Sequence, residues 1–169
     1  MKPISCCITG HRTIKMLSYA WLIDEINDIL DTLIKTHNVT EYRVGMALGT
    51  DMLVTELLLK LKKKKYQIKI IPCIPCISQP DFWPDEQKLR YYHLLTQLET
   101  PEITSQNYTP NCMLERNLSM LEKSDMVLAV FDGRYSGGTA YTVHLAAKKQ
   151  KPMIIINPFR KDVIWKNYK

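Results

Sequence analysis

The sequence predicts an α/β fold of three layers, in which a mostly parallel sheet of roughly five to seven strands is flanked by helices. Apolar runs of strand length alternate with segments whose apolar residues recur at helical spacing, and this alternation continues from end to end. No internal repeat, low-complexity segment or linker interrupts it. A length of 169 residues suits one domain spanning 1–169.

The elements of the first half follow from apolar patterns and from the glycines and prolines behind them. Residues 4–9 are a compact apolar run that ends at Gly10, as a buried strand does. Further strands are expected at 42–47, ending near Gly49, and at 67–74, where prolines follow. The two intervening helices are expected to be capped by Ser18 and Thr50, with apolar faces formed by Leu22, Ile23, Ile26, Ile29, Leu30, Leu33 and Ile34 in the first and by Leu53, Val54, Leu57, Leu58 and Leu61 in the second.

The second half of the chain continues the alternation. Acidic residues and Pro84 predict a helix that begins near Asp81 and ends near Leu98. Residues 102–108 are either a short edge strand or merely extended. The remaining expected elements are a helix carrying Arg116 and Asn117, a strand at 126–131, a helix opened by Gly137, Gly138 and Thr139, a strand at 152–157 and a surface cover at 159–169.

The charge of the chain allows a polyanionic partner, but its distribution has a simpler explanation. The net charge is +6, from 23 basic and 17 acidic residues, and the pI is near 9.0. Lysines gather at 60–65 and 148–151, where two predicted helices end and cations offset the negative end of the helix dipole. No aromatic residues interleave with these lysines, as a track for single-stranded nucleic acid requires. Nucleic acid is therefore a disfavoured partner.

Apolar runs and cysteines indicate a cytoplasmic protein. No apolar run approaches the ~20 residues of a membrane span, and the N-terminus lacks the features of a signal peptide. Five cysteines are an odd number and predict reduced thiols. Cys73 and Cys76 have the spacing of a zinc or redox site, but no second such pair accompanies them. We expect small buried side chains there, no metal site and no cofactor.

The stretch 112–142 carries the strongest functional pattern. A helix with Arg116 precedes an apolar strand, and Gly137 and Gly138 behind that strand open another helix. The first N–H groups of a helix have no partner within it, so such a turn binds anions. A nearby arginine clamps the same phosphate or carboxylate through its planar guanidinium.

Loops that lead from a predicted strand to the next helix occur at 9–13, 47–51 and 132–139. In a parallel sheet these loops share the carboxyl edge, where open α/β sheets bind ligands. His11 and Arg12 in the first loop are either anion contacts or ordinary solvent-exposed side chains. Asp51 either favours the positive end of its helix or binds a ribose hydroxyl.

Four segments of the chain form a specific set: CCITGHR, GMALGTDMLVTE, the IPC segment with Gln79 and Trp83, and CMLERNLSM followed by SD and GGTAYTV. Together they resemble the YpsA-like family of the SLOG superfamily, named for the Smf/DprA and LOG proteins. The resemblance runs from Cys6 to about Pro158. One departure is Thr13, where relatives often have proline. The resemblance implies a Rossmann-like fold with a nucleotide-type pocket at the strand ends.

The same stretch is similar to LOG enzymes, which release a base from nucleoside monophosphates. Those enzymes have a helix with Met, Arg and Lys, followed by a PGGxGTxxE turn. Asn117 replaces the lysine, and Thr142 stands where the catalytic glutamate belongs. The positions that match are Met113, Arg116, Met120, Gly138 and Thr139.

The missing glutamate places hydrolysis in doubt. Glycosidic cleavage needs a carboxylate that stabilises an oxocarbenium-like state or activates water, and threonine does neither well. Asp132, Glu115 and Glu56 are substitutes that their spacing does not distinguish. The catalytic residue is therefore unknown, and the LOG reaction is expected to be absent or very slow.

The favoured function is capture of a nucleotide-derived small molecule, such as ADP-ribose or an NAD-derived signal, by a sensor or sequestering protein. Some SLOG relatives hold such signals in anti-phage defence, and relatives are often dimers or larger, which implies a homo-oligomer. The alternatives are a LOG-like N-glycosidase of nucleoside monophosphates and DprA-like binding of single-stranded DNA. Trp83 either stacks on a base or serves as a core or lid residue. The expected ligand-binding residues are Thr9, Gly10, His11, Arg12, Ala47, Leu48, Gly49, Asp51, Trp83, Arg116, Asn117, Asp132, Gly137, Gly138 and Thr139.

Overall fold

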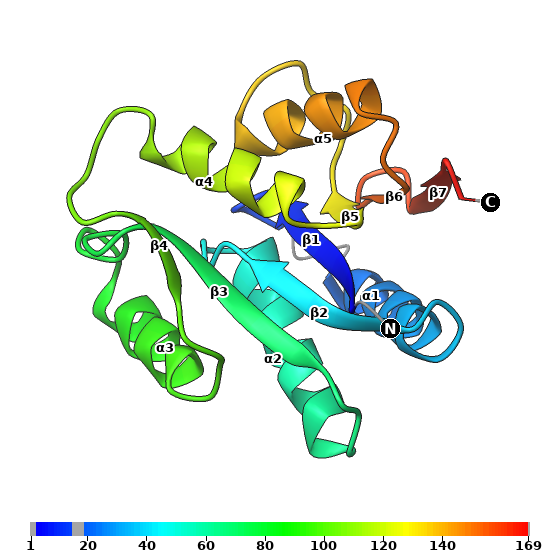
Figure 1. Cartoon of the computed structure of the whole chain (residues 1–169), viewed down its shortest axis with the longest axis horizontal. Coiled ribbons are helices and arrows are strands. Elements are labelled where there is room, and N and C mark those ends of the chain that lie inside the picture. The colour runs from blue at the N-terminus through cyan, green and yellow to red at the C-terminus, as the bar shows by residue number, and fades with distance from the viewer. Residues whose placement is uncertain (1–2, 15–18, 169) are drawn as a thin grey trace.

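The computed structural model describes residues 3–14 and 19–168 and shows a seven-stranded sheet flanked by helices (Figure 1). The strand order is β4-β3-β2-β1-β5-β6-β7, and every neighbouring pair is parallel except β6 and β7. This confirms the predicted α/β class with a mostly parallel sheet. The strands are β1 (Ile4–Gly10), β2 (Val39–Val44), β3 (Lys69–Cys76), β4 (Glu102–Ser105), β5 (Met126–Val130), β6 (Met153–Asn157) and β7 (Asp162–Lys166).

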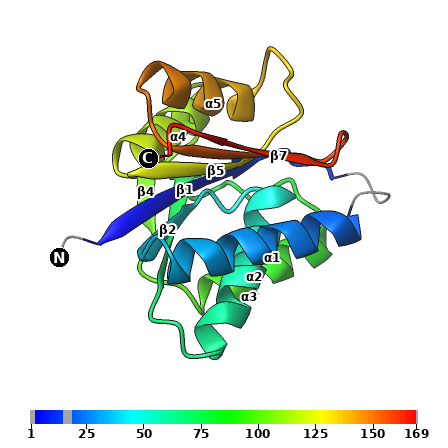
Figure 2. The same cartoon turned by 90° about the vertical axis from the view of Figure 1, so that its right-hand side faces the viewer.

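The helices form two layers on opposite faces of the sheet (Figure 2). One layer contains α1 (Tyr19–Lys35), α2 (Thr50–Lys63) and α3 (Asp85–Leu95), and the other contains α4 (Cys112–Glu122) and α5 (Gly138–Lys148). The strand order reverses at β1, which pairs with β2 on one side and β5 on the other. In open α/β sheets such a reversal leaves a crevice beyond the carboxyl ends of the strands, where ligands bind.

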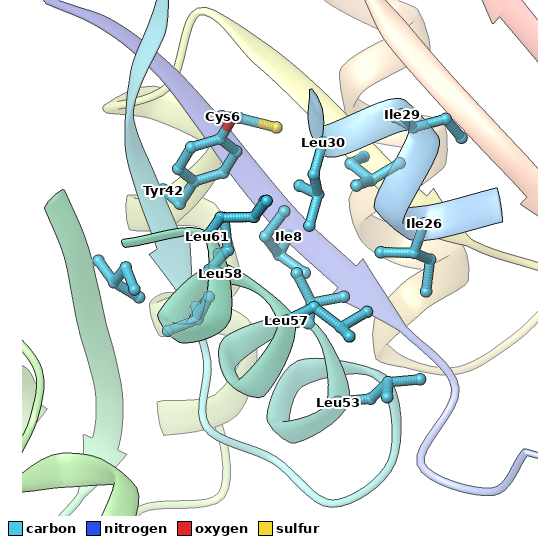
Figure 3. Close-up of a cluster of buried hydrophobic side chains, with 14 of the residues drawn as sticks. Cys6, Ile8, Ile26, Ile29, Leu30, Tyr42, Leu53, Leu57, Leu58 and Leu61 are labelled. Atoms are coloured by element: carbon cyan, nitrogen blue, oxygen red, sulfur yellow. The ribbon is translucent and has the colours of Figure 1, made fainter. Parts of the chain in front are cut away.

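The larger core lies between the sheet and the layer of α1 and α2 (Figure 3). Because side chains alternate along a strand, Ile8 of β1 points into this core, whereas its neighbour Cys7 joins the smaller core on the other face of the sheet. The fully buried residues that dominate the larger core include Leu22, Ile26, Leu30, Leu33, Tyr42, Leu58 and Ile70.

The second strand ends earlier than the sequence predicts. β2 covers Val39–Val44 instead of 42–47. The backbone leaves the sheet at Gly45 because other groups use its carbonyl oxygen: Nε2 of Gln79 donates to it at 3.1 Å, and Nη1 of Arg116 donates to it as well. The polypeptide after the strand is thereby directed toward the carboxyl edge.

The third strand continues through its prolines, although the sequence predicts that it ends there. β3 covers Lys69–Cys76 and so contains both Pro72 and Pro75. It changes partner in the middle: it pairs with β2 up to Pro72 and with β4 from Cys73 onward. A proline nitrogen needs no acceptor, so this exchange tolerates the residues that would interrupt a continuous ladder.

Three smaller expectations meet different outcomes. Thr50 is the first residue of α2 and not its cap, because Gly49 occupies the cap position and no side chain caps the helix. Ser18 lies outside the described residues. The surface cover expected at 159–169 instead includes the antiparallel edge strand β7.

Disulfides, metal-ligand clusters and membrane-spanning helices are absent from the described part of the chain. All five cysteine side chains are buried and free of disulfides. No group of three potential metal ligands occurs among residues 3–14 and 19–168. Within the same residues, no helix has the length and apolar character needed to cross a membrane.

Candidate functional site

A cavity of about 310 Å³ lies at the carboxyl edge of the sheet, near the ends of β1 and β5. Its walls come from the loop after β1, the start of α2, one side of α4 and the loop that leads into α5. Eleven of the fifteen expected ligand-binding residues line it. The lining residues are Ile8, Thr9, Gly10, His11, Arg12, Thr13, Ala47, Asp51, Arg116, Asn117, Met120, Arg134, Ser136, Gly137, Gly138 and Thr139.

The loop after β1 is locked onto the start of α2 by close backbone contact. The carbonyl oxygen of His11 accepts hydrogen bonds from the backbone N–H of Thr50 at 3.1 Å and from its hydroxyl at 3.0 Å. Gly49 has φ of 81°, and a Cβ atom there would lie 2.2 Å from the carbonyl oxygen of Arg12. Only glycine combines this conformation with this approach, so Gly49 shapes the cavity from outside it.

Arg116 is a buried side chain that joins α4 to β3 and to the residue that follows β2. Its Nη1 donates to the carbonyl oxygens of Gly45 and, at 3.0 Å, of Cys73, while Nε donates to Oδ1 of Asn117 at 2.8 Å. A Cβ atom on Gly45 would lie 2.2 Å from Nη1. No hydrogen-bond partner for Nη2 occurs among the described residues, so this nitrogen is the part of the guanidinium left for a ligand.

Asp51 is a buried carboxylate in the cavity wall. Its Oδ2 accepts the backbone N–H of Ala47 at 3.2 Å and would lie 2.7 Å from a Cβ atom on Gly45, which is therefore close to both Asp51 and Arg116. Burial raises the pKa of Asp51 to about 6, although Arg116, the Ala47 N–H and Arg12 all favour the ionised form. The pKa of Asp51 therefore lies close enough to neutral pH for this carboxyl group to exchange a proton with a bound ligand.

The N-terminus of α5 opens onto the cavity. Gly137 occupies the cap position before the helix, with φ of 104°. It has no side chain, so it supplies no acceptor for the first N–H groups of α5. Nδ2 of Asn117 reaches the carbonyl oxygen of Gly138 at 3.4 Å and so ties α4 to this turn. Free helix N–H groups next to positive side chains form an anion site.

His11, Asp132 and Arg134 form a polar cluster at the rim. Nε2 of His11 accepts the backbone N–H of Asp132 at 3.0 Å and lies 3.0 Å from Oδ1 of the same residue. Arg134 clamps the Asp132 carboxylate, with its Nη2 2.6 Å from Oδ2. Hydrogen bonding from Arg134 keeps the pKa of Asp132 far below its usual value. Burial lowers the pKa of His11, and the Arg134 charge acts in the same direction, while Asp132 opposes both.

Four expected ligand-binding residues do not line the cavity. Leu48 is half-buried against the larger core, and Gly49 acts through the loop contact described above. Trp83 packs edge-on against Tyr91, with ring centroids 5.5 Å apart, and contacts the core on the α3 side. Asp132 holds His11 and Arg134 instead of facing the cavity itself.

Five residues that were not among the expected ligand-binding residues also line the cavity. Ile8 and Met120 are buried apolar side chains, and they reach the cavity wall because of how β1 and α4 are oriented toward it. Thr13, Arg134 and Ser136 belong to loops that were expected at the site. The one available signal was position: Arg134 and Ser136 lie between Asp132 and the glycine turn, inside a loop already assigned to the carboxyl edge.

The carboxylates considered as replacements for the missing glutamate lie elsewhere. Glu56 is bound by Arg90 through contacts of 2.6 and 2.9 Å, and Glu115 is exposed outside the cavity. Thr142 is buried and donates its hydroxyl to the carbonyl oxygen of Gly138 at 2.9 Å. Among the described residues, Asp51 is the only acidic side chain in the cavity wall.

Comparison with known proteins gives relatives in sequence and others in fold. The uncharacterized SPbeta prophage-derived protein YoqJ of Bacillus subtilis (strain 168) is 30% identical over 128 residues, which cover 69% of this chain and 75% of YoqJ. DNA processing protein A of Helicobacter pylori, studied for its single-stranded DNA binding mode, superimposes with a TM-score of 0.64 at 20% identity, over 92% of this chain. This chain spans 66% of that protein.

A second similar structure is that of the Moco carrier protein of Chlamydomonas reinhardtii, with a TM-score of 0.50 and 20% identity over 91% of this chain and 76% of the carrier. These structural likenesses are too distant in sequence to show more than the fold. The YpsA family model, described as the YspA SLOG family, matches residues 6–159. That range includes all the loops around the cavity, and the chain therefore belongs to the YspA SLOG family.

Proposed function

We propose that this domain binds a phosphate-bearing, nucleotide-derived small molecule in the cavity at the carboxyl edge. The observation that carries the proposal is the convergence of the uncapped N-terminus of α5 with the Nη2 side of Arg116 on one cavity. Helix N–H groups and a guanidinium are the donors that phosphate oxygens prefer. The Moco carrier protein, named for a small-molecule cargo, shares this fold and is consistent with the proposal.

The size of the cavity favours a mononucleotide-sized moiety. About 310 Å³ lies at the lower end of the range of ligand sites, which is about 300 to 1,000 Å³. A phosphate at the start of α5 would place the attached ribose toward Asp51, which is able to accept a hydroxyl hydrogen bond when ionised. ADP-ribose or an NAD-derived signal would then extend its second half beyond the cavity. A sensor or sequestering role, also in anti-phage signalling, and assembly into oligomers are parts of the same proposal.

The proposed activity is binding and not hydrolysis. The acidic side chain in the described cavity wall is Asp51, and its Oδ2 already accepts the backbone N–H of Ala47 at 3.2 Å. Thr142 is occupied with the backbone of its own helix and supplies no base. A LOG-like reaction remains the alternative, and release of adenine from AMP that is lost in the Asp51→Asn variant would establish it.

Single-stranded DNA is a second candidate, favoured by the basic pI and by the fold shared with DNA processing protein A. The exposed lysines at 60 and 63–65 belong to the C-terminal end of α2 and its following turn, at the edge of the sheet opposite the cavity. DNA binding there would fall steeply with salt because it depends on phosphate contacts. Salt-dependent binding of an oligonucleotide that ADP-ribose does not displace would support this second candidate.

Calorimetry with ADP-ribose, NAD and AMP tests the proposal, and Asn117→Asp is the informative variant. The aspartate retains an acceptor for Nε of Arg116, so the fold is expected to survive, but it places a negative charge 3.4 Å from the Gly138 carbonyl at the anion site. We expect affinity to fall by about 10- to 100-fold, the equivalent of one charged hydrogen bond.

Asn107→Asp is the matched control, because Asn107 is exposed, lies outside the cavity and undergoes the same change of charge. Its affinity should equal that of the parent. Absence of heat with all three nucleotides, or equal affinity of the Asn117→Asp variant and the parent, would refute the proposal.

A further inference from the structure

Asp132 shares its carboxylate between a buried histidine and a half-exposed arginine. Oδ1 and Oδ2 each lie 3.1 Å from Nε of Arg134, Oδ2 lies 2.6 Å from its Nη2, and Oδ1 also accepts the Arg134 backbone N–H at 3.1 Å. Oδ1 is at the same time 3.0 Å from Nε2 of His11. The guanidinium of Arg134 and, when it is protonated, the imidazole of His11 thus compete for one carboxylate.

Nε2 of His11 faces two groups of Asp132 that require opposite protonation states. Unprotonated Nε2 accepts the backbone N–H at 3.0 Å, and its contact with Oδ1 then joins two acceptors. Protonated Nε2 would donate to Oδ1 and lose the backbone bond. With Arg134 neutralising the carboxylate, the unprotonated form is favoured, since burial and the Arg134 charge both lower the pKa of His11.

Arg134 is held far less firmly than Arg116. Its side chain is 54% exposed and lines the cavity, and among the described residues its only hydrogen-bond partner is Asp132. Because more than half of the Arg134 side chain is exposed, solvent screens its ion pair with Asp132 and lowers the free energy that the pair contributes. The loop that carries it has exposed side chains and a positive φ at Gly133 and Gly137. A phosphate in the cavity can therefore compete with Asp132 for this guanidinium.

We propose that Arg134 is an anion-binding arm that leaves Asp132 when a phosphate group enters the cavity, and that the freed carboxylate then holds His11 in its protonated form. The inference rests on the proposed function, since it requires an anionic ligand. One proton moves from solvent to Nε2 of His11, and no other covalent bond is made or broken. The imidazolium replaces the guanidinium as the partner of Asp132, so its partly buried carboxylate is not left unpaired.

The remaining charged groups around His11 keep their partners in both states. Asp51 on α2 is bonded to the Ala47 N–H, and Arg116 on α4 to two backbone carbonyls. Arg12 is exposed on the same loop as His11. On the α5 side the ring of Phe131 separates His11 from His144, with centroid distances of 5.8 and 6.3 Å. Asp132 and Arg134 are therefore the groups whose rearrangement changes the proton affinity of His11.

The arrangement in the free protein can be tested without a ligand by NMR titration of the four histidines, with His11 assigned through His11→Gln. Arg134→Gln should raise the pKa of His11 by about one unit, because the unneutralised carboxylate then favours the imidazolium. Asp132→Asn should lower it. Arg160→Gln is the matched control, since Arg160 is exposed and pairs with an aspartate two residues away at 3.1 Å. Equal His11 pKa values in Arg134→Gln and the parent would refute the inference.

Ligand-linked proton uptake is measured by titrating ADP-ribose in PIPES and in imidazole at pH about 6.5, near the ordinary pKa of histidine. Two buffers with different ionisation enthalpies report the number of protons bound. We expect uptake in the parent, a smaller uptake and at least several-fold weaker binding in Arg134→Gln, and parental values in Arg160→Gln. Binding with equal uptake in parent and Arg134→Gln overturns this inference and leaves the proposed function standing. Absence of binding by the parent overturns the proposed function itself.

Discussion

Asparagine in place of Asp51 should stabilise the fold at neutral pH and leave it unchanged in acid. Asparagine has nearly the same size as aspartate and keeps an oxygen for the Ala47 N–H, which now donates to Oδ2 at 3.2 Å. The substitution removes only the negative charge, which lies in a side chain that is 6% exposed. The difference in free energy of unfolding between the two proteins therefore reports the cost of that charge.

The magnitude follows from the pKa of Asp51, which rises from 3.8 to about 6 on folding because burial disfavours the ionised form. A shift of about two units corresponds to about 3 kcal/mol. Between these two pH values the folded state binds more protons than the unfolded state. The stability contributed by the protonated group is therefore complete below pH 3.8 and is lost as pH rises through about 6.

Urea unfolding of the parent and Asp51→Asn at several pH values from about 4 to 8 measures this directly. The variant should be more stable by about 3 kcal/mol at the upper end and nearly equal at the lower end. Asp24→Asn on the exposed side of α1 is the control for loss of a carboxylate. A difference that does not change with pH, or an asparagine variant that is less stable at pH about 8, would refute the reasoning.

Two further substitutions test the frame of the cavity. Arg116→Ala should lower the free energy of unfolding by about 2 to 5 kcal/mol in urea, because it empties a buried site and removes the donor to the carbonyl oxygens of Gly45 and Cys73. This makes Arg116→Ala unsuitable as a ligand-binding test, and stability within about 1 kcal/mol of the parent would contradict the interpretation. Gly45→Ala should depress the thermal midpoint strongly, because its Cβ would lie 2.2 Å from Arg116, whereas Gly133→Ala meets no atom within 4 Å and bears only the strain of φ 91°. Equal thermal midpoints for the two alanine variants would show that the close approach of Arg116 to Gly45 does not exclude a side chain there.

The fold was predictable because isolated apolar runs in the sequence indicate its strands. Residues 4–9 and 126–131 have no helical periodicity and become the adjacent central strands β1 and β5. The errors occur where tertiary partners decide the outcome. β2 ends at Val44 because Arg116, 71 residues later, uses the next carbonyl, and no local pattern announces such a contact.

The candidate site was predictable to the extent that topology determines it. Parallel strands bring the three loops to one edge, so most of their polar residues share the cavity. The direction of individual side chains was not predictable. Trp83 turns toward Tyr91 because an aromatic core partner is available there, and Arg134 turns toward the cavity because Asp132, two residues earlier, anchors it.

Under the proposed function, two of the three arginines in the cavity wall, Arg116 and Arg134, would have different parts in anion recognition. Arg116 is fixed by the backbone carbonyls of Gly45, just after β2, and of Cys73 in β3, so one face of its guanidinium is pre-organised and would lose little side-chain entropy when a ligand binds. Because Arg116 is held in this way, its position would be the same with and without a ligand. Arg134 lies on an exposed loop, and in the proposed rearrangement it would leave Asp132 to reach an anion and so change the charge balance at His11. Under these two proposals the rigid arginine would supply affinity, and the movable one would convert occupancy of the cavity into a local rearrangement at its rim.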